Sequence, residues 1–401
     1  MKKRNQFSML LFGIFFLIVL GNGSCFAETG VSKDLIKIGA TMDLSGPIAF
    51  MGKSVRDGAK LYFKRTNDHG GVFGRKIEFI VEDDGYKSPR AVQAVKKLIN
   101  RDEVFSMFAV LGSAQTNAIY PILKSKGVPL VTPATQNRSV AVPAKELVFL
   151  ADTHYTQQGK LAVEYVVEDL GNKTPKIAII FQNDTPGHDW RNGVRIGAKH
   201  YGLELMELPY KRGNIDFSSQ VAKCKGSGIT HVLFWGIVRE PAMLMKEAQR
   251  ANFKPAYVLA SPSISKVVLK LAGEAIGYNS NIYGLSLWID QYRDTSPGLD
   301  MFKEDIVKYE SCSLEDQYNI YGYQAAMTLV EGLNRAGKDL TRKKLISALE
   351  TFKDYDNGIL SPITWGPDSR AGGRAVKVFK VVNGAWQTTM DGWRFSQIAE
   401  E

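Results

Sequence analysis

Residues Phe105–Asn137 are FSMFAVLGSAQTNAIYPILKSKGVPLVTPATQN, and this stretch indicates the architecture of the whole chain. The apolar run 105–111 predicts a strand that is buried on both faces of a parallel sheet. Gly112-Ser113 then turns the chain, residues 114–126 have helical spacing, and 128–131 predicts the next strand. The turns after adjacent parallel strands meet at one crevice, where ligands of open α/β sheets bind.

Polar groups at these two turns predict a pocket for a small molecule that carries a carboxylate or an amide. Ser113 offers a hydroxyl and a backbone N–H beside a helix N-terminus, where the helix dipole and the free N–H groups favour an anion. Thr135 and Gln136 offer further donors, and the Ala134 carbonyl can accept from an amine. The alternative interpretation is that these Ser and Thr side chains are ordinary helix caps.

The first 27 residues have the pattern of a secretory signal. Lys2-Lys3-Arg4 precedes the apolar run 9–20, and small residues lead to an expected cleavage after Ala27. Because a bilayer span needs about 20 apolar residues, we prefer a cleaved signal to a retained anchor. Cys25 offers a second interpretation, a lipid-modified N-terminal cysteine, although the leucine expected at the start of that motif is absent. The sequence predicts export to the periplasm.

Composition argues against several classes of function. Removing residues 1–27 removes three basic groups and no acid, so the formal net charge falls from +10 to +7. The remaining charges are interspersed, without the basic runs and aromatic platforms that single-stranded nucleic acid needs. The five histidines show no metal-ligand spacing, and Asp83-Asp84 is better explained as turn chemistry than as a metal site. The common nucleotide-binding and hydrolase motifs are absent, so we expect neither catalysis nor a cofactor.

Two cysteines, Cys224 and Cys312, remain after the predicted cleavage. In an exported chain they can form one disulfide, but their spacing gives no argument for it, and two free thiols are an equal alternative.

The rest of the chain predicts two parallel sheets with helices on both faces, because strands and helices alternate repeatedly. About 370 mature residues also exceed one ordinary core. Beyond the opening stretch, we expect strands at 36–41, 76–82, 176–181, 204–209, 230–235, 256–260 and 282–287, and strand-like segments at 358–365 and 375–382. We expect helices at 52–67, from Ser88-Pro89, and at 158–168, 190–200, 218–225, 241–251, 264–271, 298–310, 318–336 and 341–351.

This order predicts two lobes and a hinge. The N-terminal lobe is expected to comprise residues 28–150 plus 288–357, and the C-terminal lobe residues 151–287 plus 358–401. The return of the chain to each lobe would place several crossing segments at their boundary.

The sequence resembles the periplasmic leucine/isoleucine/valine-type substrate-binding proteins of ABC importers. The matching stretches are IKIGATMDLSGPIAFMGKSVRDGAKLYF, GGVFGRKIEFIVEDDGYKSPRAVQAVKKLINRDEV, LGSAQT, VTPATQN, NIDFSSQVAKCKGSGITHVLFWG and YGYQAAMTLVEGL. They run in the family's order over nearly the whole mature chain. The resemblance implies the type I periplasmic-binding-protein fold, with two doubly wound lobes, three crossings and a ligand cleft between them.

The resemblance also implies roles for single residues. The serine that holds the ligand carboxylate in the family matches Ser113, next to Gly112. The loop residues that give a carbonyl and a hydroxyl match Ala134 with Thr135 or Gln136.

Several family positions are changed in this sequence. The aromatic residue after the first strand falls at Met51, next to Phe50, and a second-lobe aromatic position falls near Trp235. The acid that holds the amino group of amino-acid ligands falls near Ser261, where no carboxylate is present. The positions of the family's N-lobe disulfide fall near Tyr86 and Gly112, so that bridge is absent.

By resemblance, the protein captures a small amino acid of the branched-chain type or a related carboxylate, by hinge closure. Its partners would be the permease and ATPase subunits of an ABC importer, and it would act as a monomer without metal or cofactor. Because an ammonium buried without an acid is costly, either Asp184, Glu240 or another acid takes the missing role, or the ligand is an amine-free acid or amide. A ligand-sensing module that reports to a receptor is the alternative from another class.

Overall fold

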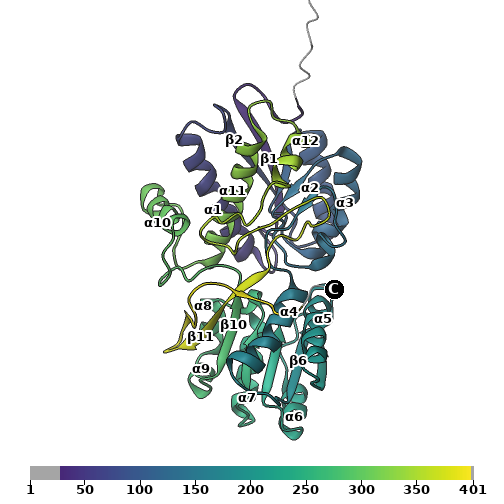
Figure 1. Ribbon diagram of the computed structural model, residues 1–401, viewed down its shortest axis with the longest axis vertical. Helices are drawn as coiled ribbons and strands as arrows, with labels where there is room; N and C mark the ends of the chain where they lie inside the picture. Colours follow the sequence, from purple (N-terminus) through teal and green to yellow (C-terminus); the bar gives the residue numbers. More distant parts are fainter. Residues whose placement is uncertain (1–27, 399–401) are drawn as a thin grey trace, which may run out of the picture.

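The computed structural model describes residues 28–398 and divides them into two α/β lobes, one above the other in Figure 1. The predicted signal sequence lies outside the described residues. No helix within residues 28–398 is long and apolar enough to cross a membrane.

The first lobe contains a five-stranded parallel sheet with the strand order β2-β1-β3-β4-β5. Its strands are β1 (Leu35–Met42), β2 (Lys76–Asp83), β3 (Ser106–Phe108), β4 (Leu130–Val131) and β5 (Val148–Phe149). Its early helices are α1 (Ala49–Asp68), α2 (Ser88–Asn100) and α3 (Ser113–Lys126). Consecutive β-α units therefore build a parallel sheet, as the alternation predicted.

The second lobe contains an eight-stranded sheet with the order β12-β11-β10-β9-β8-β6-β7, in which β13 also pairs with β11. Its strands are β6 (Ile177–Gln182), β7 (Leu205–Tyr210), β8 (His231–Trp235), β9 (Ala256–Leu259), β10 (Ile282–Ser286), β11 (Ala375–Val382), β12 (Ala385–Thr388) and β13 (Arg394–Phe395). Its helices are α4 (Tyr155–Glu164), followed by a π-helical turn over Tyr165–Asp169, α5 (Thr185–His200), α6 (Ser218–Gly226), α7 (Arg239–Arg250), α8 (Lys266–Ala272) and α9 (Ala275–Tyr278). Strand β11, near the C-terminus, pairs antiparallel with β10. The C-terminal segment of the chain therefore completes the sheet of the second lobe.

Three helices follow β10 without a strand between them, as predicted: α10 (Pro297–Tyr309), α11 (Gln317–Ala336) and α12 (Arg342–Leu349). Helix α11 packs against α1 in the upper lobe of Figure 1. The two helices approach closely because glycines face each other's backbone. A Cβ on Gly58 would lie 1.9 Å from the Asn319 carbonyl oxygen, and one on Gly322 would lie 2.0 Å from that of Val55.

The chain therefore passes between the lobes three times, after β5, after β10 and after α12. This arrangement agrees with the predicted fold class. The residue boundaries proposed for each lobe stay a prediction.

Two strand predictions need correction. Within the expected strand 105–111, only β3 forms continuous hydrogen-bonded pairing with its neighbours. Ala109 adopts a left-handed φ of 45°, which takes the chain out of the sheet. The expected strand-like segment 358–365 forms only isolated bridges. There, the Asn357 side chain accepts hydrogen bonds from the N–H groups of Ile359 and Leu360, both at 2.9 Å, which replaces strand pairing with a turn.

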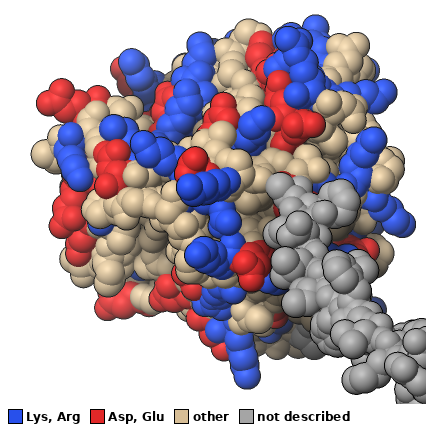
Figure 2. Space-filling view, turned by 90° about the horizontal axis from the view of Figure 1, so that it is seen from above, with Lys and Arg blue, Asp and Glu red and all other residues tan. Residues whose placement is uncertain are grey.

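The structure also shows the state of the two cysteines and the distribution of charged residues. Cys224 and Cys312 are free thiols, and burial raises the pKa of each to about 11. Basic and acidic residues are interspersed over the face shown in Figure 2, which looks onto the first lobe from above.

Candidate ligand-binding site

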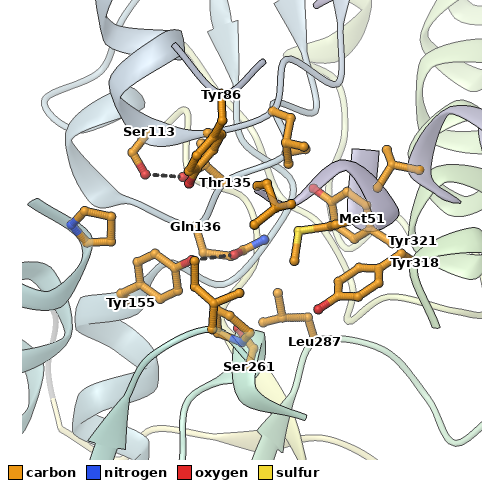
Figure 3. Close-up of a pocket in the computed structure, with 18 of the residues that line it drawn as sticks. Met51, Tyr86, Ser113, Thr135, Gln136, Tyr155, Ser261, Leu287, Tyr318 and Tyr321 are labelled. Atoms are coloured by element: carbon orange, nitrogen blue, oxygen red, sulfur yellow. Dashed lines mark hydrogen bonds between the residues drawn. The ribbon is translucent and has the colours of Figure 1, made fainter. Parts of the chain in front are cut away.

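A cavity lies between the two lobes (Figure 3). Both lobes contribute to its wall. The lining residues are Ile48, Met51, Val55, Tyr86, Leu111, Gly112, Ser113, Ala134, Thr135, Gln136, Tyr155, Pro186, Trp235, Ile237, Ser261, Pro262, Leu287, Trp288, Tyr318 and Tyr321.

The first-lobe part of the wall is built where β3 and β4 end. Ala109 and Thr132 both adopt left-handed conformations, with φ of 45° and 50°, and lead the chain out of the two strands. Leu111 and Ala134 then meet in an isolated parallel bridge, which brings the turns after β3 and β4 side by side. The local break in each strand therefore creates the crevice that the sequence predicted.

Ser113 begins α3, and its hydroxyl lies 2.7 Å from that of Thr135 (Figure 3). The first N–H groups of a helix have no partner within the helix, so this end favours a carboxylate oxygen. Gly112 allows the turn because its φ is 105°, and a Cβ there would lie 2.3 Å from the Gln115 side-chain oxygen. No side-chain cap bond is made at this helix start, so Ser113 is not a plain helix cap, and its role as an anion anchor stays a prediction.

Gln136 lines the cavity, but its side-chain amide is already engaged. Its Nε2 donates to Asp152 Oδ2 at 2.7 Å, and its Oε1 accepts from the Tyr155 hydroxyl at 2.9 Å. The Tyr321 hydroxyl donates to the same Asp152 oxygen at 2.8 Å. This network orients two tyrosines and one amide in the wall.

The backbone carbonyl of Ala134 also has a partner, because it accepts from the Gly112 N–H at 3.2 Å. The Gln136 amide, expected as a donor to the ligand, and the Ala134 carbonyl, expected to accept from an amine, therefore each have a hydrogen-bond partner within the protein.

No acidic side chain lines the cavity. Burial raises the pKa of Asp152 to about 6, against the opposing effect of hydrogen bonds from Gln136 and Tyr321. Asp184 caps α5 and pairs with Arg212, and Glu240 is buried in the first turn of α7. Asp184 and Glu240, the acids considered as replacements at the amine position, are thus both absent from the wall.

The second lobe presents two donors with no protein partner. Trp235 Nε1 and Ser261 Oγ make no hydrogen bond to any described residue, although each of these residues is only 2% exposed. Trp235 is held by an edge-on contact with the Tyr155 ring, with centroids 5.4 Å apart. Buried donors without partners are rare, so a hydrogen-bond acceptor on a bound molecule is their natural partner.

None of the twenty lining residues is charged. Apolar and aromatic side chains form most of the wall, and the polar groups are hydroxyls, an engaged amide and an indole N–H. Such a site can hold an apolar body with an acceptor group at one end.

The structure brings most of the predicted site residues together. Met51, Gly112, Ser113, Ala134, Thr135, Gln136, Trp235 and Ser261 all line the cavity. Phe50 does not, because its side chain is 40% exposed and packs edge-on against Tyr318 outside the wall.

Sequence reasoning missed four tyrosines of the wall. Tyr318 and Tyr321 lie one turn apart in α11, a spacing visible in the sequence, but helical periodicity does not tell which face meets the cleft. Tyr155 begins α4, and Tyr86 lies in the turn after β2.

The Asp83-Asp84 pair is turn chemistry, as preferred. Burial raises the pKa of Asp83, but hydrogen bonds from Ser45, Leu44 and Gly85 and the charge of Arg90 together lower it to about 2. Within residues 28–398, no group of three or more His, Cys, Asp or Glu side chains is arranged to hold a metal ion.

The chain is thus a two-lobed α/β protein with a cavity between its lobes. A family model described as periplasmic binding protein matches residues 35–385, and this chain belongs to that family. The family resemblance expected from the sequence motifs is confirmed.

Individual relatives agree with this placement. The chain is 24% identical over 317 residues to the leucine-, isoleucine-, valine-, threonine- and alanine-binding protein of Pseudomonas aeruginosa, covering 78% of this chain and 82% of the relative. It is 23% identical over 341 residues to the Leu/Ile/Val-binding protein of Escherichia coli K12, covering 85% and 89%.

Solved structures show the same fold. A branched-chain amino acid ABC transporter protein from Thermus thermophilus, with bound valine, superposes with a TM-score of 0.82 at 18% identity, covering 92% of this chain and 98% of that one. A fatty acid ABC transporter substrate-binding protein from Thermomonospora curvata gives 0.80 at 24% identity, covering 93% and 95%. The family model therefore identifies the chain as a periplasmic binding protein, and these solved structures share its fold.

Proposed function

We propose that this protein is the periplasmic solute-binding component of an ABC importer and that its ligand is a small apolar carboxylic acid or amide without an amino group. The observation that carries the ligand class is the uncharged wall of the cavity, combined with two buried second-lobe donors that have no partner among residues 28–398.

The absence of a lining carboxylate argues against an α-amino acid. A buried ammonium needs an ionic partner, since an unpaired buried charge costs several kcal/mol. The family position for that partner falls at Ser261, a hydroxyl. The nearest buried acid in the network, Asp152, stands behind Gln136 and Tyr321 and is not part of the wall.

The polar groups of the wall suit an acceptor. One carboxylate or amide oxygen can accept at Ser113, where the N-terminus of α3 stabilises negative charge. The second lobe adds Trp235 N–H and Ser261 O–H. Because the donors come from both lobes, a bound acceptor would favour the arrangement in which the lobes approach each other.

Hinge closure then works as a population shift. The ligand binds first to the Ser113 side of the cleft, and contacts with the second lobe favour the closed state by their differential affinity. In this proposal the permease recognises the closed, loaded form.

The decisive experiment compares ligands that differ only in the amino group. Titration calorimetry of the protein should be run with leucine, 4-methylpentanoate and 4-methylpentanamide, and with phenylalanine and 3-phenylpropanoate. A thermal-shift assay gives an independent readout, because a binder at 100 times its Kd adds about 2.7 kcal/mol to stability.

We expect the amine-free member of at least one pair to bind at least tenfold more tightly than its amino acid. Tighter binding of leucine than of 4-methylpentanoate would contradict the ligand class and leave the solute-binding role intact. Binding of no member of the panel would contradict the ligand class in both its acid and amide forms.

A further inference from the structure

Arg212 connects the two lobes beside the ligand cavity. It follows β7 of the second lobe, and its guanidinium carbon lies 5.3 Å from the centroid of the Tyr86 ring. Tyr86 follows β2 of the first lobe and lines the cavity. A guanidinium within about 6 Å of an aromatic ring is attracted to the π-face.

The second lobe holds Arg212 in place through Asp184. Arg212 Nη2 lies 2.9 Å from Asp184 Oδ2. The other carboxylate oxygen, Asp184 Oδ1, caps α5 by accepting from the Gly187 N–H at 3.1 Å. Because the carboxylate is fixed at a helix start, it fixes the guanidinium as well.

Contacts within the first lobe also fix the position of Tyr86. Its N–H donates to Asp84 Oδ1 at 2.8 Å, and its backbone is in the left-handed region with φ of 60°. The ring packs on the turn before Ser113, since a Cβ on Gly112 would lie 2.9 Å from Tyr86 Cε2. The ring that Arg212 contacts therefore packs directly on the turn that leads into Ser113.

We propose that Arg212 holds the two lobes together beside the ligand cavity and so retains the ligand. The inference rests on the proposed function, because it takes the cleft as the binding site. Arg212 does not line the cavity, so it acts on ligand affinity through Tyr86 and through the equilibrium between open and closed lobes.

A second ion pair provides a matched control. The Arg195 side chain is 51% exposed and pairs with Glu207, which is 26% exposed. For Arg212 and Asp184 the exposed fractions are 51% and 24%. Arg195 and Glu207 both belong to the second lobe, in α5 and β7, so this pair does not bridge the lobes.

The first measurement needs no ligand. Small-angle X-ray scattering should give a larger radius of gyration for Arg212→Ala than for the unchanged protein, and Arg195→Ala should leave it unchanged. Tyr86→Ala should produce the same opening, and adding Arg212→Ala to it should produce no further increase, because both variants remove one contact. Thermal melting of each variant checks that it is folded.

The second measurement is the affinity for 4-methylpentanoate by calorimetry. We expect Arg212→Ala to weaken it roughly three- to thirtyfold, the range that a cation–π contact gives between exposed and desolvated sites. Arg195→Ala should change it less than twofold.

An unchanged radius of gyration in Arg212→Ala would overturn the proposal, as would an equal increase in Arg195→Ala. Additive effects of the Arg212 and Tyr86 variants would also overturn it. If 4-methylpentanoate does not bind the unchanged protein, the proposed ligand class is in error, and the scattering result still decides the role of Arg212.

Discussion

The hydroxyl groups of Ser113 and Thr135 lie 2.7 Å apart, although the two residues belong to turns after different strands. The distance follows from the parallel order of β3 and β4 and from the bridge between Leu111 and Ala134. Adjacent strands thus deliver two hydroxyls to one point at the N-terminus of α3, where the first N–H groups of the helix also point. This pair is the part of the cavity with the strongest physical reason to bind a carboxylate.

Replacing Ser113 by alanine should weaken binding of 4-methylpentanoate by about 1–3 kcal/mol, because a charged oxygen loses a hydrogen-bond donor in a buried site. The midpoint of thermal unfolding should change little. Ser125→Ala is a suitable control, since Ser125 is an exposed residue of the same helix whose hydroxyl bonds only the Ile122 carbonyl. Calorimetry on both variants checks the prediction, and equal affinities of Ser113→Ala and the unchanged protein would remove Ser113 from the site.

A carboxylate placed at position 261 should change the ligand preference. In Ser261→Asp the new acid would stand in the wall of the cavity, where it can pair with an ammonium and repel a carboxylate. We expect the affinity for leucine to rise relative to that for 4-methylpentanoate by at least tenfold.

Ser261→Ala separates charge from hydrogen bonding, because it removes the unpaired hydroxyl without adding an acid. It should weaken 4-methylpentanoate binding and leave leucine binding no better. If Ser261→Asp binds the two compounds in the same ratio as the unchanged protein, position 261 does not select against the amine.

The sequence predicted the architecture well and the chemistry of the site only in part. Alternation of apolar runs and amphipathic segments is a local signal. It located most helices and strands of both lobes, but it missed the short strands β5, β12 and β13 and the one-turn helix α9. It also placed Ser113 and Thr135 correctly, since turns after neighbouring parallel strands must meet. What it could not show is where side-chain bonds go. The sequence presents Gln136 as a free donor, but in the structure its amide is hydrogen-bonded to Asp152 and Tyr155. Both of these residues belong to the chain segment that leaves the first lobe.

The tyrosines of α11 were missed for a related reason. Helix α11 is buried over most of its length, so its sequence carries no clear polar face from which to infer its orientation. Only its packing on α1, through Gly58 and Gly322, turns Tyr318 and Tyr321 toward the cavity.

That packing leads to a stability prediction. Gly322→Ala should lower the free energy of unfolding by about 1–3 kcal/mol or more, because the added methyl group would overlap the Val55 carbonyl and force α11 away from α1. Gly226→Ala is the control. A Cβ there meets nothing within 4 Å at the end of α6, so alanine should stabilise the protein by up to about 1 kcal/mol. Urea denaturation measures both, and an unchanged midpoint for Gly322→Ala would show that the two helices can separate without cost.

The buried carboxylate behind the cavity gives a pH prediction. Burial raises the pKa of Asp152 from an ordinary 3.8 to about 6 in the folded protein. Between these two values the folded state binds more protons at this site than the unfolded state, so the contribution of Asp152 to stability falls as the pH rises from about 4 to about 6. The side chain in Asp152→Asn does not ionise, so the stability of this variant does not fall through this site as the pH rises.

The measurable quantity is the difference in unfolding free energy between Asp152→Asn and the unchanged protein, taken from urea denaturation at several pH values. Asp189 has a pKa that burial also raises to about 6, but it is present in both proteins and cancels in the difference. We expect Asp152→Asn to gain on the order of 2 kcal/mol relative to the unchanged protein between pH 4 and pH 7. Parallel stability curves would mean that the Asp152 carboxylate ionises at its ordinary pKa, because its hydrogen bonds to Gln136 and Tyr321 balance the effect of its burial.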